Sequence, residues 1–274
     1  MTPASPPAGR ELPLVSVILP VYNGEKYLAR TLDSLLGQTY PALEVIAVDD
    51  ESGDRSPAIL GEYREKFRGR LEVLRVPNGG VSRARNAGVV RARGFYIAFL
   101  DQDDLWIPDK VARQVESLSR SRKRIGFTNM AVIDGEGRTL SPRIRRFPGG
   151  NEVNWFEQVL FDPIVGISSV MMERSLFSEA GGFSPELRLA EDYDLLLRIF
   201  HGERPEVLDE PLLLYREHGG SSTFTRVDAL IRETGDILGK WMVADPEVFR
   251  RSRLRYAKFR LKLEFLRIKA ILGR

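Results

Sequence analysis

The chain has 274 residues, of which 43% are hydrophobic and 29% charged, a composition typical of a globular protein with a substantial core. It has no cysteine, which excludes disulfides and thiolate metal ligands, and with only 2 histidines a zinc site would be hard to assemble. The metal that this composition can support is a hard cation held by carboxylate oxygens, Mg²⁺ or Mn²⁺.

Formal charge is distributed unevenly along the chain. The segment from Val248 to Arg274 holds ten Lys or Arg and one acid, Glu264, so it carries +9 while the remainder carries −6, for a net charge of +3. The basic character is therefore a property of this terminal segment. We expect no nucleic-acid binding by the main domain.

Residues 1–13 are rich in Pro, Ala and Ser and lack the basic start and apolar run of a secretory signal. We interpret them as a disordered leader. No apolar stretch approaches the roughly 20 residues that a membrane-spanning helix needs. Together with the lack of cysteine, these features predict a cytoplasmic protein.

Short apolar runs alternate with helical patterns up to residue 100. Strands are predicted at 14–19, 43–48, 71–76 and 95–100, and helices at 24–36, from the turn after residue 54 to 67, and at 81–91. This alternation predicts an α/β fold with a mostly parallel sheet and helices on both faces. Ligands of such sheets bind at the carboxyl ends of the strands, and three of the four ends here are polar or acidic.

The second half of the chain is less regular. After Pro108 we predict a helix to 124, a strand at 125–133, a hairpin turn at 134–137, a helix at 152–160, a strand at 167–172, a helix at 191–200, an extended segment at 207–215 and a long helix at 246–272. No internal repeat is present.

The sequence Asp101-Gln102-Asp103-Asp104 follows the fourth predicted strand directly. Three carboxylates on one turn repel each other unless a divalent cation is shared between them, and such a cation can bridge to a diphosphate. The alternative is that these acids cap the next helix or face water.

Other motifs accompany this acidic turn in a fixed order. They are Pro20-Val21-Tyr22-Asn23, Asp49-Asp50-Glu51-Ser52, Ala84-Arg85-Asn86-Ala87-Gly88, Gly94-Phe95-Tyr96-Ile97 and Ala190-Glu191-Asp192-Tyr193-Asp194. From Val15 to Ser222, the set resembles family 2 of the glycosyltransferases, an inverting, nucleotide-sugar-dependent group. The resemblance implies a GT-A-type, Rossmann-like sheet with a C-terminal helical extension added in this chain.

The resemblance also implies roles for individual residues. Asp50 would bind the base, usually uracil, Asp192 would be the catalytic base, and Asp103 the principal metal ligand. The other implied nucleotide-binding residues are Pro20, Val21, Tyr22, Arg85 and Asp101, and the other implied metal ligands are Asp101 and His218. Apart from the resemblance, Glu191 and Trp106 are candidates for substrate binding, Trp106 by stacking on an acceptor sugar. Several of these residues have a structural alternative: turn formation for Asp50, a solvated helix face for Arg85, a helix cap for Glu191-Asp192, a structural role for His218, and core packing for Trp106.

The expected function is therefore transfer of a sugar, from a UDP-sugar by preference, to a saccharide or lipid-linked hydroxyl in the synthesis of cell-surface glycans. A cation would stabilise the departing diphosphate and a carboxylate would take the acceptor proton. The alternatives are a catalytically inactive sugar-nucleotide-binding module and a nucleotidyltransferase. A dinucleotide-binding dehydrogenase is excluded because Gly-x-Gly-x-x-Gly is missing after the first strand.

Three parts of the chain are predicted beyond the leader: a nucleotide-binding half at 14–104, an acceptor-binding half of the same domain at 105–222, and a helical extension at 223–274. Apolar residues recur at helical spacing in the extension with basic residues between them. Such a helix either lies on an anionic membrane surface, which would make the protein peripheral on the inner face, or packs on the domain or on the second subunit of a homodimer.

Overall fold

The computed structural model describes residues 12–144, 147, 153–219 and 226–272. Most of the predicted leader and the predicted boundary at 222/223 lie outside these ranges. The strands are β1 Val15–Val21, β2 Leu43–Asp49, β3 Leu71–Arg75, β4 Tyr96–Phe99, β5 Leu105–Trp106, β6 Ile125–Ile133, β7 Thr139–Ser141, β8 Val170–Glu173 and β9 Glu206–Arg216. The helices are α1 Leu28–Leu36, α2 Ser56–Lys66, α3 Val81–Arg91, α4 Lys110–Ser121, α5 Trp155–Phe161, η1 Ile167–Ser169, α6 Arg174–Glu179, α7 Glu191–Phe200, α9 Val227–Ala244, α10 Pro246–Arg251 and α11 Arg253–Leu272.

One sheet runs through the molecule in the order β3-β2-β1-β4-β8-β6-β9-β5, and β7 pairs with β6. The pairs β3–β2, β2–β1 and β1–β4 are parallel, as predicted. The second half is mixed: β8 runs antiparallel to β4 and β6, β9 is parallel to β6, and β5 is antiparallel to β9. The sheet therefore changes direction at β4, directly before the acidic turn.

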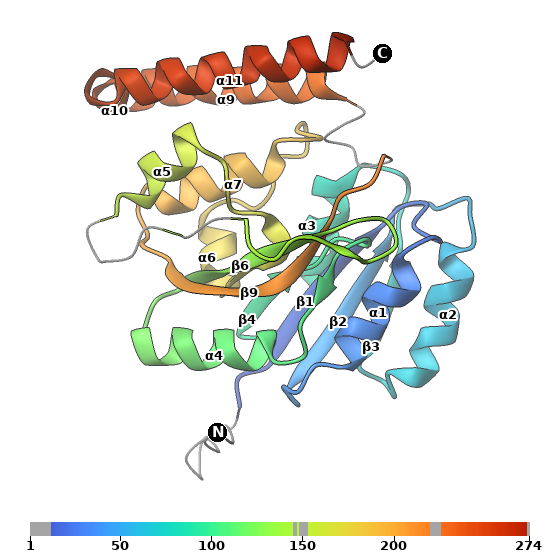
Figure 1. The fold of residues 1–274 in the computed structure, drawn as a ribbon. Coiled ribbons are helices and arrows are strands. Elements are labelled where there is room, and N and C mark those ends of the chain that lie inside the picture. Colours follow the sequence, from blue (N-terminus) through green and yellow to red (C-terminus); the bar gives the residue numbers. More distant parts are fainter. Residues whose placement is uncertain (1–11, 145–146, 148–152, 220–225, 273–274) are drawn as a thin grey trace.

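Helices cover both faces of the sheet (Figure 1). Alternate residues of β1 enter different apolar clusters: Val17 and Leu19 pack with α1, α2 and α4, whereas Ile18 packs with α3, α5 and α7. This alternation is the strand period of two, and it explains why β1 is apolar without interruption.

The C-terminal helices extend the apolar cluster that contains Ile18. Figure 1 shows α9 and α11 side by side, on the far side of α5 and α7 from the sheet. Phe259 and Leu263 of α11 are buried in the same cluster as α7. The predicted long helix is divided at Ser252, whose hydroxyl bonds to Glu157 of α5 and whose amide bonds to Val248. Within the described ranges, no helix is both long and apolar enough to cross a bilayer.

Candidate active site

A cavity of about 830 Å³ opens at the carboxyl ends of the parallel strands, a volume within the range of small-molecule sites. Every predicted site residue lines it except His218 and Trp106. We call one part the acidic end; its residues are Pro20, Val21, Tyr22, Asp50, Asn78, Gly80, Arg85, Asp101, Gln102, Asp103 and Asp104. The other part, the helical end, is lined by Arg226, Leu230, Thr234, Phe259, Lys262, Leu263 and Leu266.

Asp50 fixes the backbone of the acidic end. Its two carboxylate oxygens accept hydrogen bonds from the amides of Gly79 and Gly80, each at 2.8 Å. Gly80 has a φ of +86°, and a Cβ there would meet the guanidinium of Arg188, so a glycine is required. Asp50 is thus a loop-forming residue that also lines the cavity, and its contact with a base stays a prediction.

The turn after β1 is tied to the acidic turn. Gln102 accepts from the amide of Tyr22 at 2.9 Å and donates to its carbonyl at 3.0 Å. The Tyr22 side chain is left 51% exposed at the rim of the cavity. This fixed backbone and exposed ring can hold a planar ligand by stacking.

The three acids of the turn lie in different environments. Asp103 contacts His218, with 2.9 Å between Oδ2 and Nε2. Burial and the neighbouring Asp101 charge raise the pKa of Asp103, against the opposing effect of His218. Asp104 is buried and accepts from the amide of Arg216 at 3.0 Å; burial, followed by the charge of Asp103, raises its pKa well above the usual value. Negative charge is therefore crowded here, a condition that a divalent cation relieves.

The donor set fits Mn²⁺ or Mg²⁺ in its chemistry, because carboxylate oxygens are the ligands these ions prefer. Asp103 and His218 already form a pair. Asp101, however, is bonded to Arg85, and across the described residues no group of three or more His, Asp or Glu is arranged as a metal centre. Of the three predicted metal ligands, the fold brings Asp103 and His218 into direct contact.

Arg85 is buried between two acids. One guanidinium nitrogen lies 2.6 Å from Asp101 and another 2.6 Å from Glu191. Arg85 therefore does not lie on a solvated helix face, which was the structural alternative for this residue. Nε of Arg85 and Oε2 of Glu191 are buried without a hydrogen-bond partner, so each could still form a hydrogen bond with a ligand. Arg85 joins the turn after β4 to the start of α7.

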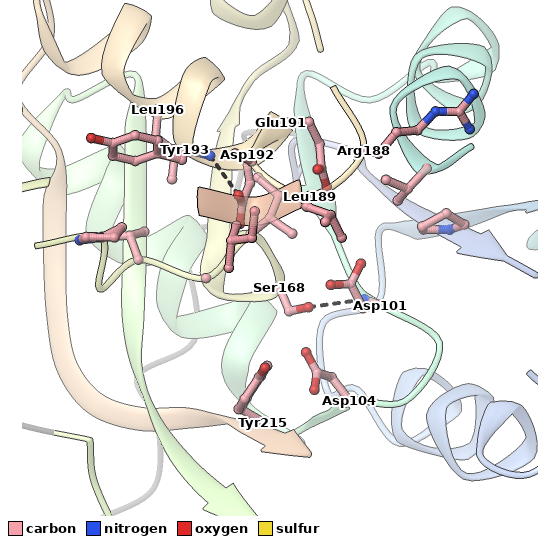
Figure 2. Close-up of a pocket in the computed structure, with 18 of the residues that line it drawn as sticks. Asp101, Asp104, Ser168, Arg188, Leu189, Glu191, Asp192, Tyr193, Leu196 and Tyr215 are labelled. Atoms are coloured by element: carbon pink, nitrogen blue, oxygen red, sulfur yellow. Dashed lines mark hydrogen bonds between the residues drawn. The ribbon is translucent and has the colours of Figure 1, made fainter. Parts of the chain in front are cut away.

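Asp192 lies in the first turn of α7, on the wall of the cavity opposite the acidic turn. Figure 2 shows its carboxylate with those of Glu191, Asp101 and Asp104 around this pocket. Burial first, then the charge of Glu191, raises the pKa of Asp192 to about 7, against the opposing effect of Arg85. A carboxylate with this pKa is suited to accept a proton near neutral pH.

The loop that leads into α7 is held by the C-terminal extension. Glu233 of α9 accepts hydrogen bonds from the amides of Arg188, Leu189 and Ala190, at 3.2, 2.9 and 3.0 Å. The position of Asp192 thus depends on a side chain from α9.

Trp106 and His218 lie outside the cavity wall. Trp106 is buried, donates from Nε1 to the carbonyl of Ser168 at 2.8 Å, and has the Lys110 ammonium 3.9 Å from its ring centroid. The geometry therefore favours the core role for Trp106 over stacking on an acceptor. His218 contacts Asp103, and the centroid of its ring lies 4.8 Å from that of Tyr27.

Several lining residues were not predicted from the sequence. Ser168 accepts from the amide of Asp101 at 3.1 Å (Figure 2), and Arg188 and Tyr215 line the same pocket. The residues of the helical end were missed as well. The Asn78-Gly79-Gly80 turn follows the third predicted strand, but nothing in the sequence indicates that Arg188 is the neighbour of Gly80.

Comparison with known proteins identifies the family of the chain. The family model of Glycosyl transferase family 2 matches residues 16–181. The chain is 35% identical over 181 residues to the putative teichuronic acid biosynthesis glycosyltransferase TuaG of Bacillus subtilis, which is 66% of this chain and 69% of that protein. It spans 63% to 69% of the length of several curated glycosyltransferases that it matches.

Two solved structures share the fold. TarS of S. aureus, in complex with UDP-GlcNAc, superposes with a TM-score of 0.65 at 20% identity, covering 94% of this chain and 81% of that one. The mannosyltransferase PcManGT of Pyrobaculum calidifontis, in complex with GDP-Man and Mn²⁺, gives a TM-score of 0.68 at 21% identity, covering 98% and 75%. The predicted GT-A-type fold is confirmed by these likenesses.

Proposed function

This chain belongs to glycosyltransferase family 2, and we propose that it transfers a sugar from a nucleotide-sugar donor to an acceptor hydroxyl with inversion at the anomeric carbon. The observation that carries the proposal is the placement of Asp192, with a pKa of about 7, across one cavity from Asp101 and Asp103. Donor and acceptor sites would then share this cavity, with residues 14–104 forming most of the nucleotide-binding half and 105–222 most of the acceptor-binding half.

We assign the donor to the acidic end. The nucleoside would lie at the carboxyl end of β1, against Pro20, Val21 and Tyr22, with Asp50 lining the same part of the cavity. UDP is the donor nucleotide that we propose, in line with the UDP-GlcNAc bound by TarS; the GDP-Man bound by PcManGT makes the choice of base a question for experiment.

Asp103 and His218, with Asp101 after release from Arg85, are the residues that would hold Mn²⁺ or Mg²⁺. When bound, the cation supplies charge stabilisation to the departing nucleoside diphosphate. We propose a structural role for Asp104, since it is buried and accepts a hydrogen bond from the Arg216 amide.

Asp192 would take the proton of the acceptor hydroxyl as the oxygen attacks the anomeric carbon. Glu191 keeps negative charge beside Asp192, which favours its proton uptake, and Arg85 holds Glu191 in place at 2.6 Å. One base acting in a single displacement gives inversion, because attack occurs on the face opposite the leaving group.

The acceptor would enter from the helical end. This end combines the apolar side chains of Phe259 and Leu263 with the cations Arg226 and Lys262, a lining that suits a saccharide or lipid-linked acceptor carrying phosphate. The relative TuaG is named for teichuronic acid biosynthesis, and we propose a role for this chain in cell-surface polysaccharide synthesis on the cytoplasmic side.

Release of UDP from UDP-sugars in the presence of candidate acceptors tests the proposal. We expect turnover that requires Mn²⁺ or Mg²⁺ and falls by about 10² to 10⁴ in Asp192→Asn, the range for loss of a general base. Donor binding, measured as a thermal shift with Mn²⁺, is expected to persist in this variant. Asp228→Asn, in an exposed position of α9, is the matched control and should keep full activity.

Two results would contradict the proposal. Donor binding without turnover for any acceptor would indicate an inactive binding module. Release of pyrophosphate from a nucleoside triphosphate and a sugar phosphate would indicate a nucleotidyltransferase.

A further inference from the structure

Helix α11 is apolar on two opposite faces, and the domain covers only one of them. On the inner face, Phe259 and Leu263 are 3% and 8% exposed. On the outer face lie large apolar side chains, namely Leu254, Leu261, Phe265 and Ile268, which are 82%, 71%, 67% and 52% exposed. Their spacings of seven, four and three residues place all four on one stripe of the helix. We call this set the outer stripe.

Basic side chains border the outer stripe on both sides. Arg253, Arg260 and Arg267 recur every seven residues and so form a row along one border. Arg255, Lys258 and Lys262 form a row along the other border, by the same helical spacing. All six are exposed, and Glu264 is the one acid in the sequence from Arg253 to Ile268.

Some of these cations also contact acids on the domain. Lys262 lies 3.4 Å from Asp162, Arg255 lies 3.5 Å from Glu157, and Arg267 lies 3.9 Å from Asp228. These contacts are at the surface, where ion pairs are weak and readily exchanged for other anions. They therefore leave the basic side chains able to bind other anions.

We propose that the outer stripe and its two basic rows bind the surface of an anionic lipid bilayer. An apolar ridge between two rows of cations is the arrangement by which a helix lies in a membrane interface: the ridge enters the acyl boundary and the cations meet lipid phosphates. A second copy of this chain docked on the same stripe would place basic rows against basic rows, and like charges at close range are unfavourable.

The inner face of the same helix borders the cavity, through Phe259, Leu263 and Leu266. A bilayer bound to the outer stripe is therefore separated from the helical end of the cavity by the thickness of one helix. The surface is independent of the transfer chemistry, so its test does not rely on the proposed function.

Flotation of the full chain with lipid vesicles tests the proposal. We expect it to float with vesicles of equal parts phosphatidylcholine and phosphatidylglycerol, to remain unbound with pure phosphatidylcholine vesicles, and to bind less at higher salt. The double variant Leu261→Gln/Phe265→Gln should weaken partitioning by at least about 100-fold, because two apolar side chains no longer enter the lipid. Both positions are exposed, so the fold should persist, with an unchanged thermal midpoint.

The double variant Arg253→Gln/Arg260→Gln isolates the charge. At about 1 kcal/mol for each basic residue near an anionic surface, removal of two charges corresponds to about a 30-fold loss of partitioning. The matched control is Val90→Gln/Phe95→Gln, which alters two exposed apolar side chains at the end of α3 and the start of β4 and should leave partitioning unchanged.

Three outcomes would overturn the proposal. The chain could stay unbound with both kinds of vesicle. It could float equally well when the outer stripe is altered, which would place the contact elsewhere. It could also show a dimer mass in sedimentation that the Leu261→Gln/Phe265→Gln variant reduces to a monomer mass while vesicle binding is absent, which would make a second copy the occupant.

Discussion

At the acidic end of the cavity, the functional side chains come from turns that follow strands, and hydrogen bonds hold them in place. Asp50 accepts two backbone amides, Gln102 is bonded twice to Tyr22, and Arg85 lies between Asp101 and Glu191. At the helical end, by contrast, most of the lining comes from the sides of α9 and α11, whose lining side chains pack by apolar contact, while the hydrogen bonds of Glu233 lie at the loop before α7.

This contrast shows how one cavity can combine fixed chemistry with a variable substrate. Hydrogen bonds are directional, so a change at the acidic end displaces groups that must meet a reacting atom within tenths of an ångström. Apolar contact is non-directional, so side chains at the helical end can change in shape while the helices stay docked. We therefore expect the two ends to respond differently to mutation.

Arg85→Met is expected to have the largest effect on stability. It leaves Glu191 buried, and Asp101 partly exposed, without their cation, and loss of one partner of a buried pair such as Arg85–Glu191 costs about 3–5 kcal/mol of unfolding free energy. Denaturant unfolding followed by circular dichroism measures the loss. Arg91→Met, on the same helix but in an exposed pair with Glu72, should cost at most about 1 kcal/mol. Equal effects of the two variants would contradict the role of Arg85 as a buried bridge.

Leu263→Ala tests the helical end. Removal of this buried side chain should cost about 2–3 kcal/mol of unfolding free energy, the lower part of the range for Leu→Ala, because one side of Leu263 borders the cavity. Leu261→Ala, two residues away but exposed, should change it by less than about 0.5 kcal/mol. Mn²⁺-dependent donor binding is expected to stay constant in both; a loss of donor affinity in Leu263→Ala would show that the two ends are not separable.

The third prediction concerns the pH dependence of turnover, for which we expect a smaller effect than the two losses of unfolding free energy. It rests on Asp192, which lies between the two ends of the cavity. A general base acts in its ionised form, so a pKa of about 7 predicts a rate that rises about tenfold per pH unit below 7 and levels off above it. Glu191→Gln should move the midpoint to lower pH, because the charge of Glu191 raises the pKa of Asp192. A profile that is flat from pH 5 to pH 8 would remove Asp192 from this role.

The regular elements could be predicted where apolar periodicity and turn residues agree. Helix 81–91, strand 125–133 and helix 191–200 have the predicted limits in the structure. The two-residue strand β5, the short helix α6 and the division at Ser252 were missed, because elements this short carry no period and are formed by tertiary contacts.

The site could be predicted where it follows strand ends. The acids of the turn after β4 and the first turn of α7 do line one cavity, and their roles as ligand and base remain predictions. The partners of Arg85 could not be derived, since Glu191 is 106 residues away in the sequence and only the fold brings them together. The helical end was missed for a similar reason: spacing shows that α11 has two apolar faces, but it does not show which one the domain covers.

The three hydrogen bonds that Glu233 accepts from the loop before α7 limit how this protein can be divided for gene fusion. A cut placed at the apparent domain boundary would leave the amides of Arg188, Leu189 and Ala190 without their acceptor, directly beside Asp192. The extension is thus not an exchangeable module joined at its end, because part of the anchorage of the active-site helix is encoded within it. A chimera that replaces these helices should retain an acid at the position of Glu233.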